Sequence, residues 1–361
     1  MDAAVGQIAL PTPLLETHRA AGAKLGEWFG CALPSDFGDW RAEYRFAREF
    51  VAVLDKNYRA YLSFAGPDRV RYLNAILTND IKALKTGEGA VSLFLNPQGR
   101  IQAEIETYAE AERLFCVSFA MIREKLIPAL DHYIIMDDVT LTDETARYGT
   151  LALEGPRAAT IAKKLANIDM EILPELGGRE FKIDSIPCRV VKRSLGGVPS
   201  AEFVCEQSQL PALWNLLLET AKANGGGPAG YTALNALRLE TGSPWFGYDF
   251  GEKQIPHEAG LEKSHISYTK GCYTGQEIVE RVRSRGQVNR VRSLFRLSSS
   301  NLPAADTAIQ FEGKEVGYVT RAAESPAFQS VIAMGYIRRE QSVPGTEVQI
   351  DGASAAVILP R

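Results

Sequence analysis

The chain has 361 residues, a formal net charge of -4 at neutral pH and a pI near 5.8, a balance that argues against a general nucleic-acid binder. This length predicts two or three domains with ample chain to bury a core. No apolar run is long enough to span a membrane, and the N-terminus lacks the basic and apolar regions of a signal peptide, so we expect a cytoplasmic protein without membrane partners.

Five cysteines and four histidines are scattered along the chain without the spacing of a metal site. We therefore expect no metal bound by this chain alone. An odd number of cysteines in a reducing compartment suits free thiols. Cys116 and Cys205 lie within apolar runs, and we expect both in the core.

The first half of the chain reads as alternating helices and strands. The spacing of apolar residues predicts, in order, helices over 13–29 and 40–50, strands over 51–55 and 60–64, and a helix capped by Asp68. A second strand, Gly-Pro turn and helix follow over 151–165. Two such units predict a pseudo-duplicated α+β body.

Between these units, the turn Asn96-Pro97-Gln98-Gly99 joins two predicted strands over 90–95 and 100–108 into a hairpin. Alternation along the second strand places Glu104 and Glu106 on one face. Two interpretations of this face stay open. It is a solvated surface, because acids are almost never buried unless paired, or it is the wall of a site.

The second half begins with helical and strand patterns and ends with strands alone. We expect a helix over 121–132, a strand over 134–141, helices over 210–223 and 231–241, and a flexible loop over 225–228. From residue 288 onwards, short alternating runs separated by turns are typical of an all-β unit.

The segment Lys-Gly-Cys-Tyr-Thr-Gly-Gln-Glu, residues 270–277, precedes a short predicted helix that Gly286 can end. Thr274 and Glu277 have the spacing of a capping box. Cys272 would then lie just before a helix N-terminus and two residues after Lys270, and both neighbours favour a thiolate. The alternative, a small buried hydrophobic cysteine, stays open.

These eight residues closely resemble the signature of the YgfZ family, folate-associated proteins that support iron–sulfur enzymes and share a superfamily with the glycine-cleavage T-protein. Residues 236–242, 255–261 and several C-terminal segments resemble that superfamily too. The resemblance covers nearly the whole chain. It implies an α+β fold with a T-protein-like pseudo-duplicated α/β body of two subdomains over 1–287, followed by a small C-terminal β-barrel over 288–361.

The resemblance also implies a site for tetrahydrofolate or a derivative. Cys272 and Glu104 are the candidate catalytic residues, Glu104 because it falls under an acidic pair of the T-protein, one member of which acts near the folate. The candidate folate-binding residues are Arg238, Glu258, Lys270, Tyr273, Gln276, Glu277 and Arg281. Arg238 and Glu258 could instead belong to structural ion pairs.

The chain departs from the T-protein pattern at several polar positions. Phe119 stands where that pattern has an Asn, and Leu234 stands where it has an Arg. Such changes remove partners for the polar edge of a pterin ring.

Three functions follow as hypotheses. The first is a YgfZ-like folate-binding protein whose Cys272 takes part in thiol or one-carbon chemistry that supports iron–sulfur cluster assembly or repair, with iron–sulfur client or assembly proteins as partners. The alternative is a tetrahydrofolate-dependent aminomethyltransferase of the glycine-cleavage type that uses Glu104 and a lipoyl carrier protein. The third is a folate-binding module without activity. The sequence leaves open the folate species, the clients, the oligomeric state and whether the chain is an enzyme.

Overall fold

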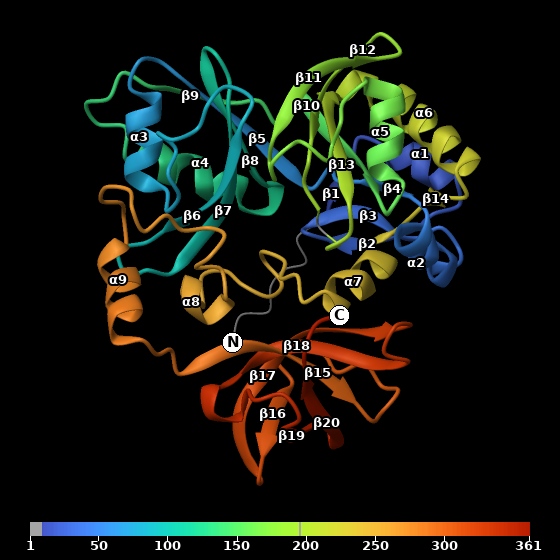
Figure 1. The fold of residues 1–361 in the computed structure, drawn as a ribbon, viewed down its shortest axis with the longest axis vertical. Coiled ribbons are helices and arrows are strands. Elements are labelled where there is room, and N and C mark those ends of the chain that lie inside the picture. The colour runs from blue at the N-terminus through green and yellow to red at the C-terminus, as the bar shows by residue number, and fades with distance from the viewer. Residues whose placement is uncertain (1–8, 195) are drawn as a thin grey trace.

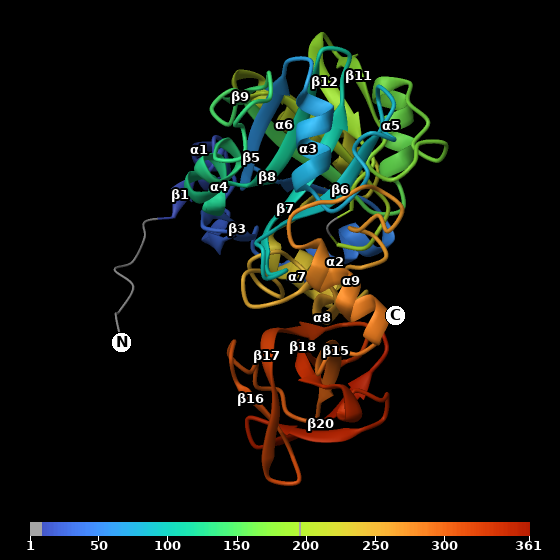
Figure 2. The ribbon, with the colours of Figure 1, turned by 90° about the vertical axis from the view of Figure 1, so that its left-hand side faces the viewer.

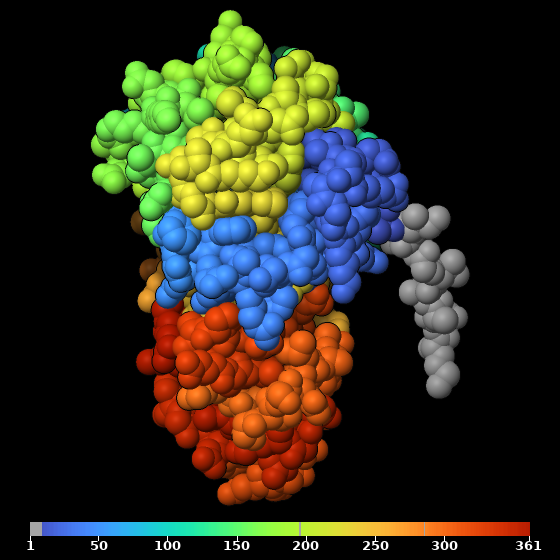
Figure 3. Space-filling model, turned by 90° about the vertical axis from the view of Figure 1, so that its right-hand side faces the viewer, coloured from blue at the N-terminus to red at the C-terminus, as the bar shows by residue number. Residues whose placement is uncertain are grey.

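The computed structural model describes residues 9–194 and 196–361. A body of two neighbouring sheets with their helices lies above a separate barrel (Figure 1). Figure 2 shows three helices at the junction between body and barrel: α7 (Tyr231–Glu240), α8 (Pro256–Ala259) and α9 (Gln276–Arg285). In the space-filling view the orange and red barrel forms one end of the molecule, beneath the blue N-terminal segments (Figure 3).

The first sheet has five strands in the order β6-β7-β8-β5-β9. Its strands are β5 (Arg59–Ala65), β6 (Gly89–Leu95), β7 (Ile101–Ala109), β8 (Arg113–Phe119) and β9 (Thr140–Asp143). Helices α3 (Arg69–Ile76) and α4 (Arg123–Asp131) contribute Leu73 and Leu126 to the core of this subdomain. The predicted hairpin is confirmed, because β6 and β7 pair antiparallel.

The second sheet has six strands in the order β11-β12-β13-β10-β4-β14. Its strands are β4 (Ala52–Asp55), β10 (Tyr148–Glu154), β11 (Gly178–Ile183), β12 (Ile186–Val191), β13 (Ser200–Glu206) and β14 (Gly227–Pro228). Helices α5 (Ala158–Ala166) and α6 (Leu210–Ala223) pack on it and bury Ile161 and Trp214. Cys205 lies in this core and Cys116 in that of the first sheet, as expected.

The two sheets repeat one local arrangement. In the first, β5 leads through Gly66-Pro67 into α3, and in the second β10 leads through Gly155-Pro156 into α5. This confirms the pseudo-duplicated body. The chain passes from β4 in the second sheet to β5 in the first within residues 56–58, so these residues lie at the seam between the sheets.

The C-terminal unit is a closed barrel with the strand order β15-β18-β17-β16-β19-β20. Its strands are β15 (Arg290–Leu297), β16 (Ala308–Phe311), β17 (Lys314–Ser325), β18 (Ser330–Arg338), β19 (Glu347–Ile350) and β20 (Ala353–Ile358). Alternate side chains such as Phe295, Leu297 and Ile309 fill its interior. The all-β prediction is confirmed, while the exact boundary at 287/288 stays a prediction.

The N-terminal region differs from the predicted long helix over 13–29. Helix α1 (Leu15–Ala20) ends at a turn, where Gly22 adopts φ 74°, and the two strands after the turn form a small three-stranded sheet with a strand that precedes α1. Its strands are β1 (Leu10–Pro11), β2 (Lys24–Trp28) and β3 (Cys31–Asp36). The next helix, α2 (Trp40–Glu49), is as predicted.

The strand predicted over 134–141 is also wrong at its start. Ile135 and Met136 are 80% and 91% exposed, and the strand begins only at Thr140. The remaining short elements are 3-10 turns at Ala120–Ile122, Gln207–Gln209 and Arg339–Gln341. Among the described residues, none of the helices combines the length and apolar character needed to cross a membrane.

Candidate functional site

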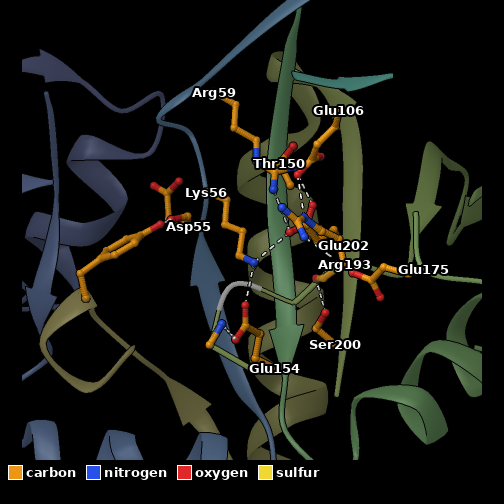
Figure 4. Close-up of polar contacts among 12 residues, drawn as sticks. Asp55, Lys56, Arg59, Glu106, Thr150, Glu154, Glu175, Arg193, Ser200 and Glu202 are labelled. Carbon is orange, nitrogen blue, oxygen red and sulfur yellow. Dashed lines mark hydrogen bonds and ion pairs between the residues drawn. The ribbon is translucent and has the colours of Figure 1, made fainter. Parts of the chain in front are cut away.

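A group of charged side chains lies at the seam between the two sheets, and most of its members are shown in Figure 4. We call it the charged cluster; it consists of Lys56, Arg59, Glu104, Glu106, Glu154, Arg193 and Glu202. Burying charges is costly unless they pair and their hydrogen bonds are satisfied. The charged cluster is therefore stable only if its charges are paired.

On the side of the second sheet, Lys56 is the central cation. Its Nζ lies 2.6 Å from Oε1 of Glu154 and 2.8 Å from Oε1 of Glu202, and all three side chains are fully buried. Burial by itself lowers the pKa of Lys56, but Glu154 and Glu202 outweigh it and raise that pKa. Arg59 completes this half by donating two hydrogen bonds, of 2.6 and 2.9 Å, to the Glu202 carboxylate.

On the side of the first sheet, Arg193 holds two carboxylates of β7. Its Nη2 donates to Glu104 at 2.9 Å and its Nε donates to Glu106 at 2.8 Å. Burial alone would raise the pKa of Glu106, but Arg59, Arg193 and a hydrogen bond from Tyr108 lower it to about 2. Both glutamates are 7% exposed, so the solvated-surface interpretation of this face is wrong.

A small pocket adjoins these carboxylates. Its lining includes Tyr58, Glu104, Phe119 and Arg193, and its volume is about 20 Å³. That volume accommodates roughly one water molecule, so this pocket does not hold a pterin ring in the structure as it stands.

A larger pocket of about 450 Å³ lies next to the small one, between body and barrel. Phe119 lines the small pocket, Phe246 lines the larger one, and their ring centroids are 5.0 Å apart. Gln102, two residues before Glu104 on β7, also reaches the larger pocket. Its volume falls within the range of roughly 300–1,000 Å³ typical of ligand pockets. Its aromatic lining includes Tyr248, Phe250 and Tyr318, which suits a flat heteroaromatic ring.

The signature segment differs from expectation at the helix start. Helix α9 begins at Gln276 behind Gly275, which has φ 81°, so Thr274 lies outside the N-cap position and the predicted capping box is wrong. Gly275 occupies this position because a Cβ atom there would lie 2.7 Å from the carbonyl oxygen of Asn96. The hairpin turn between β6 and β7 therefore positions α9.

Cys272 is exposed, so the alternative of a small buried cysteine is wrong. Lys270, expected to support a thiolate, instead donates from Nζ to the carbonyl oxygens of Asn74, Leu77 and Asn79. Burial lowers the pKa of Lys270 to about 8. These three hydrogen bonds fix the segment to the last turn of α3 and to the connection that follows it. A catalytic role for Cys272 stays a prediction.

His265 brings the same region of the chain to the charged cluster. Its Nε2 lies 4.0 Å from Oε1 of Glu104, and its Nδ1 lies 2.7 Å from Oγ of Ser264. His265 is 7% exposed, and within the described part of the chain Nε2 has no hydrogen-bond partner. A buried imidazole with one free nitrogen beside a carboxylate is a candidate for interaction with a substrate.

Arg238 and Glu258 lie in separate local networks. Arg238 is fully buried, forms an ion pair with Asp249, and stacks 4.6 Å from the ring centroid of Trp245. This ion pair is the structural role that the sequence left open for Arg238. Glu258 accepts a hydrogen bond from the backbone of Ile255 at 3.0 Å and pairs with Arg100 at 3.2 Å.

The remaining candidates lie near the start of α9. Lys270 is 5.1 Å from the ring centroid of Tyr273, which is buried. Glu277 and Arg281 form an exposed pair with an N–O distance of 2.8 Å, and Gln276 is half-buried. Folate binding by these residues, and by Arg238 and Glu258, stays a prediction.

Sequence reasoning missed most of the charged cluster. Lys56 and Glu154 each end an apolar run, Val-Ala-Val-Leu-Asp-Lys and Leu-Ala-Leu-Glu, and Glu202 interrupts another. Charges inside such runs are a usable signal of buried pairing. Arg193 gave no comparable signal, because it lies in a polar connection between β12 and β13.

Comparisons with known proteins cover nearly the whole chain. The GCVT N-terminal domain family matches residues 14–266, and the glycine cleavage T-protein C-terminal barrel domain family matches residues 290–358. An aminomethyltransferase of Rubrobacter xylanophilus is 28% identical over 91% of this chain and 87% of its own length. An aminomethyltransferase of Moorella thermoacetica is 27% identical over 94% of this chain and 92% of its own length.

A solved structure has the same fold. The glycine cleavage system aminomethyltransferase T from Bartonella henselae superposes with a TM-score of 0.87 at 23% identity, covering 97% of each chain. The predicted α+β fold with a C-terminal barrel is thereby confirmed.

These comparisons correct the first functional hypothesis. The T-protein superfamily was identified correctly, but the curated relatives that match over most of this chain are named aminomethyltransferase, which contradicts the YgfZ-like function inferred from the signature at 270–277. The iron–sulfur partners rested on the same inference and have no support. The signature was a poor guide because it spans eight residues, whereas the relatives align over 329 residues or more.

Proposed function

This chain belongs to the glycine cleavage T-protein family, with its GCVT N-terminal domain and its C-terminal barrel domain, and we propose that it is a tetrahydrofolate-dependent aminomethyltransferase of the glycine-cleavage type. Its curated relatives carry that name over most of their length. In this proposal an aminomethyl group arrives on a lipoyl carrier protein, its carbon passes to the folate, and ammonia is released.

The observation that carries the proposal is the fixed carboxylate of Glu104. Glu104 lines a pocket, and Arg193, in the connection between β12 and β13, donates a hydrogen bond of 2.9 Å to its carboxylate. A carboxylate that is already oriented and shielded from bulk water stabilises developing positive charge without reorganising during the reaction. During an aminomethyl transfer, nitrogen atoms of the reactants acquire positive charge.

The charge balance of the cluster supports the same role. Within the described residues, the carboxylates Glu104, Glu106, Glu154 and Glu202 outnumber the cations Lys56, Arg59 and Arg193. An excess of negative charge in a buried site favours a cationic group in the adjoining pocket.

The larger pocket is where we place the folate. Tetrahydrofolate, when bound, supplies the nitrogen that accepts the one-carbon unit. The aromatic side chains of Tyr248, Phe250 and Tyr318 would hold its ring, while Gln102 offers an amide on the same strand as Glu104. The rings of Phe119 and Phe246 pack against each other where the linings of the two pockets meet.

The test is release of ammonia from the aminomethylated lipoyl carrier protein in the presence of tetrahydrofolate. We expect release that requires both the protein and the folate. A characterised aminomethyltransferase serves as the positive control. If the chain binds tetrahydrofolate in calorimetry but releases no ammonia under conditions in which the control does, the proposal is wrong and a folate-binding module remains.

Two substitutions sharpen this test. Glu104→Gln keeps the shape of the side chain and removes its charge, so we expect the rate to fall by roughly a hundredfold or more. Glu180→Gln removes a carboxylate whose side chain is 80% exposed, on β11, and should leave the rate unchanged. If Glu104→Gln and Glu180→Gln release ammonia at the same rate, Glu104 has no catalytic role and the proposal loses its carboxylate.

A further inference from the structure

Cys188 and Cys205 lie opposite each other on neighbouring strands. Strands β12 and β13 pair antiparallel with Arg189 against Val204, so the next pair along the same register is Cys188 and Cys205. The two residues are 4% and 2% exposed, and all five cysteines are free thiols in the structure. A hydrogen bond to the Cys188 thiol, together with burial, raises the pKa of Cys205. The two sulfur atoms therefore face each other.

This placement matches the geometry of a disulfide. Directly opposed residues of an antiparallel pair have Cα atoms about 4.5 or 5.5 Å apart, depending on their hydrogen bonding. Disulfides usually join Cα atoms roughly 4.4–6.8 Å apart. A bond between the two sulfur atoms therefore requires little movement of either strand.

The thiols are also accessible from a pocket. Cys188 and Cys205 both contribute to the lining of a pocket of about 630 Å³ at the seam between the sheets, which shares no lining residue with the proposed folate pocket. Its polar rim includes Arg113, Arg147 and Arg189. A small oxidant can approach the sulfur atoms by this route even though their exposed surface is small.

The segment between the two cysteines carries two members of the charged cluster. Arg193, which binds Glu104 and Glu106, follows β12, and Glu202, which binds Lys56 and Arg59, lies on β13. A covalent link between Cys188 and Cys205 would close this hairpin at its base. Closing a loop removes conformational freedom from the unfolded chain and limits opening of the hairpin.

We propose that Cys188 and Cys205 are a modification site at which a peroxide forms a reversible disulfide that closes the β12–β13 hairpin. Cys188 attacks the peroxide as its thiolate, because the raised pKa of Cys205 keeps that partner protonated; the O–O bond breaks, and the Cys188 sulfur becomes a sulfenic acid as hydroxide leaves. The second thiol then displaces the hydroxyl group as water and the S–S bond forms. The two sulfur atoms lose two electrons to one peroxide, and a dithiol reductant reverses the reaction.

The experiment uses the full chain treated with increasing hydrogen peroxide, followed by denaturation, alkylation of the remaining thiols and mass mapping of peptides from the monomer. We expect a peptide pair linked through Cys188 and Cys205, and its loss after dithiothreitol. Cys116 is the internal control: it is 1% exposed and lies against Thr107 at 3.6 Å, so it should remain fully alkylated. Full alkylation of both Cys188 and Cys205 after peroxide has oxidised the exposed Cys272 would overturn the proposal.

A second measurement tests the effect on the hairpin. Oxidised protein should unfold at a midpoint a few degrees higher than reduced protein, and dithiothreitol should abolish the difference. Cys205→Ala should show no such shift. A shift of the same size in this variant would assign the effect to another thiol. Neither measurement uses transfer activity, so the outcome is independent of the proposed function.

Discussion

The Nε2 atom of His265 lies 4.0 Å from Oε1 of Glu104, although the two residues are 161 positions apart in the chain. This distance exceeds that of a hydrogen bond, so the imidazole has unused capacity beside the carboxylate. Ser264 contacts the other ring nitrogen and helps to orient the ring. The segment that leads to the signature thus contributes a polar group to the charged cluster.

We predict that His265→Gln lowers kcat of the proposed transfer by roughly tenfold, because it removes an imidazole nitrogen that is free to hydrogen-bond the substrate beside Glu104. KM for tetrahydrofolate should change little, because His265 does not line the pocket in which we place the folate. Steady-state kinetics at varied tetrahydrofolate concentration separate the two constants. An unchanged kcat would limit His265 to a packing role.

Arg193→Met should destabilise the protein by about 3–5 kcal/mol, because it leaves the carboxylates of Glu104 and Glu106 buried beside fewer cations. Chemical denaturation measures the loss. Arg193→Lys keeps the charge but not the two-pronged geometry, so it should recover only part of the stability. Full recovery with Lys would show that charge alone matters.

Acid should weaken the charged cluster through Glu106. Its pKa is about 2 in the folded protein, below the value of about 4.3 expected in the unfolded chain. A lowered pKa adds stability that is fully present above the unfolded value and is lost as pH falls from about 4.3 towards 2.

We therefore predict that the loss of stability between pH 5 and pH 3 is smaller in Glu106→Gln than in wild type, although the variant is less stable at neutral pH. Urea midpoints at several pH values provide the measurement. Glu16→Gln is the matched control, because the side chain of Glu16 is 80% exposed and pairs only with exposed Arg19 in the described contacts. Parallel curves for Glu106→Gln and wild type would contradict the prediction.

Gly275→Ala should destabilise the protein by about 2 kcal/mol or more, because the residue has φ 81° and an added Cβ atom would lie 2.7 Å from the carbonyl oxygen of Asn96. Gly286 at the other end of α9 has the same φ and open space around its Cβ position. Gly286→Ala therefore reports the backbone strain alone. Equal losses of stability would show that the contact with the hairpin turn contributes nothing.

Cys272 should react first among the five cysteines with a maleimide, because it is exposed and the other four are buried. Mass mapping at short reaction times gives the order directly. If modified protein retains full transfer activity, Cys272 has no catalytic role. If Cys272 reacts no faster than the four buried cysteines, its side chain is not exposed as the structure shows.

The amino-acid sequence by itself determined most of the elements. Helix α6 and the hairpin of β6 and β7 were predicted because their apolar periodicity and turn residues agree locally. The error over 13–29 arose where a turn at Gly22 interrupts a helical pattern. The sequence also indicated Glu104 as a candidate, but it left open whether the face that carries Glu104 is solvated or buried. The alternation along a strand shows which side chains share a face and does not show what covers that face.

Only the tertiary structure decided the content of the site. Arg193 reaches Glu104 from the connection between β12 and β13, Lys56 meets Glu154 and Glu202 from the turn between β4 and β5, and His265 lies in the segment before the signature. These contacts link residues far apart in the chain, and no local pattern encodes them. Packing of the two sheets against each other removes these charges from water and thereby forces them to pair.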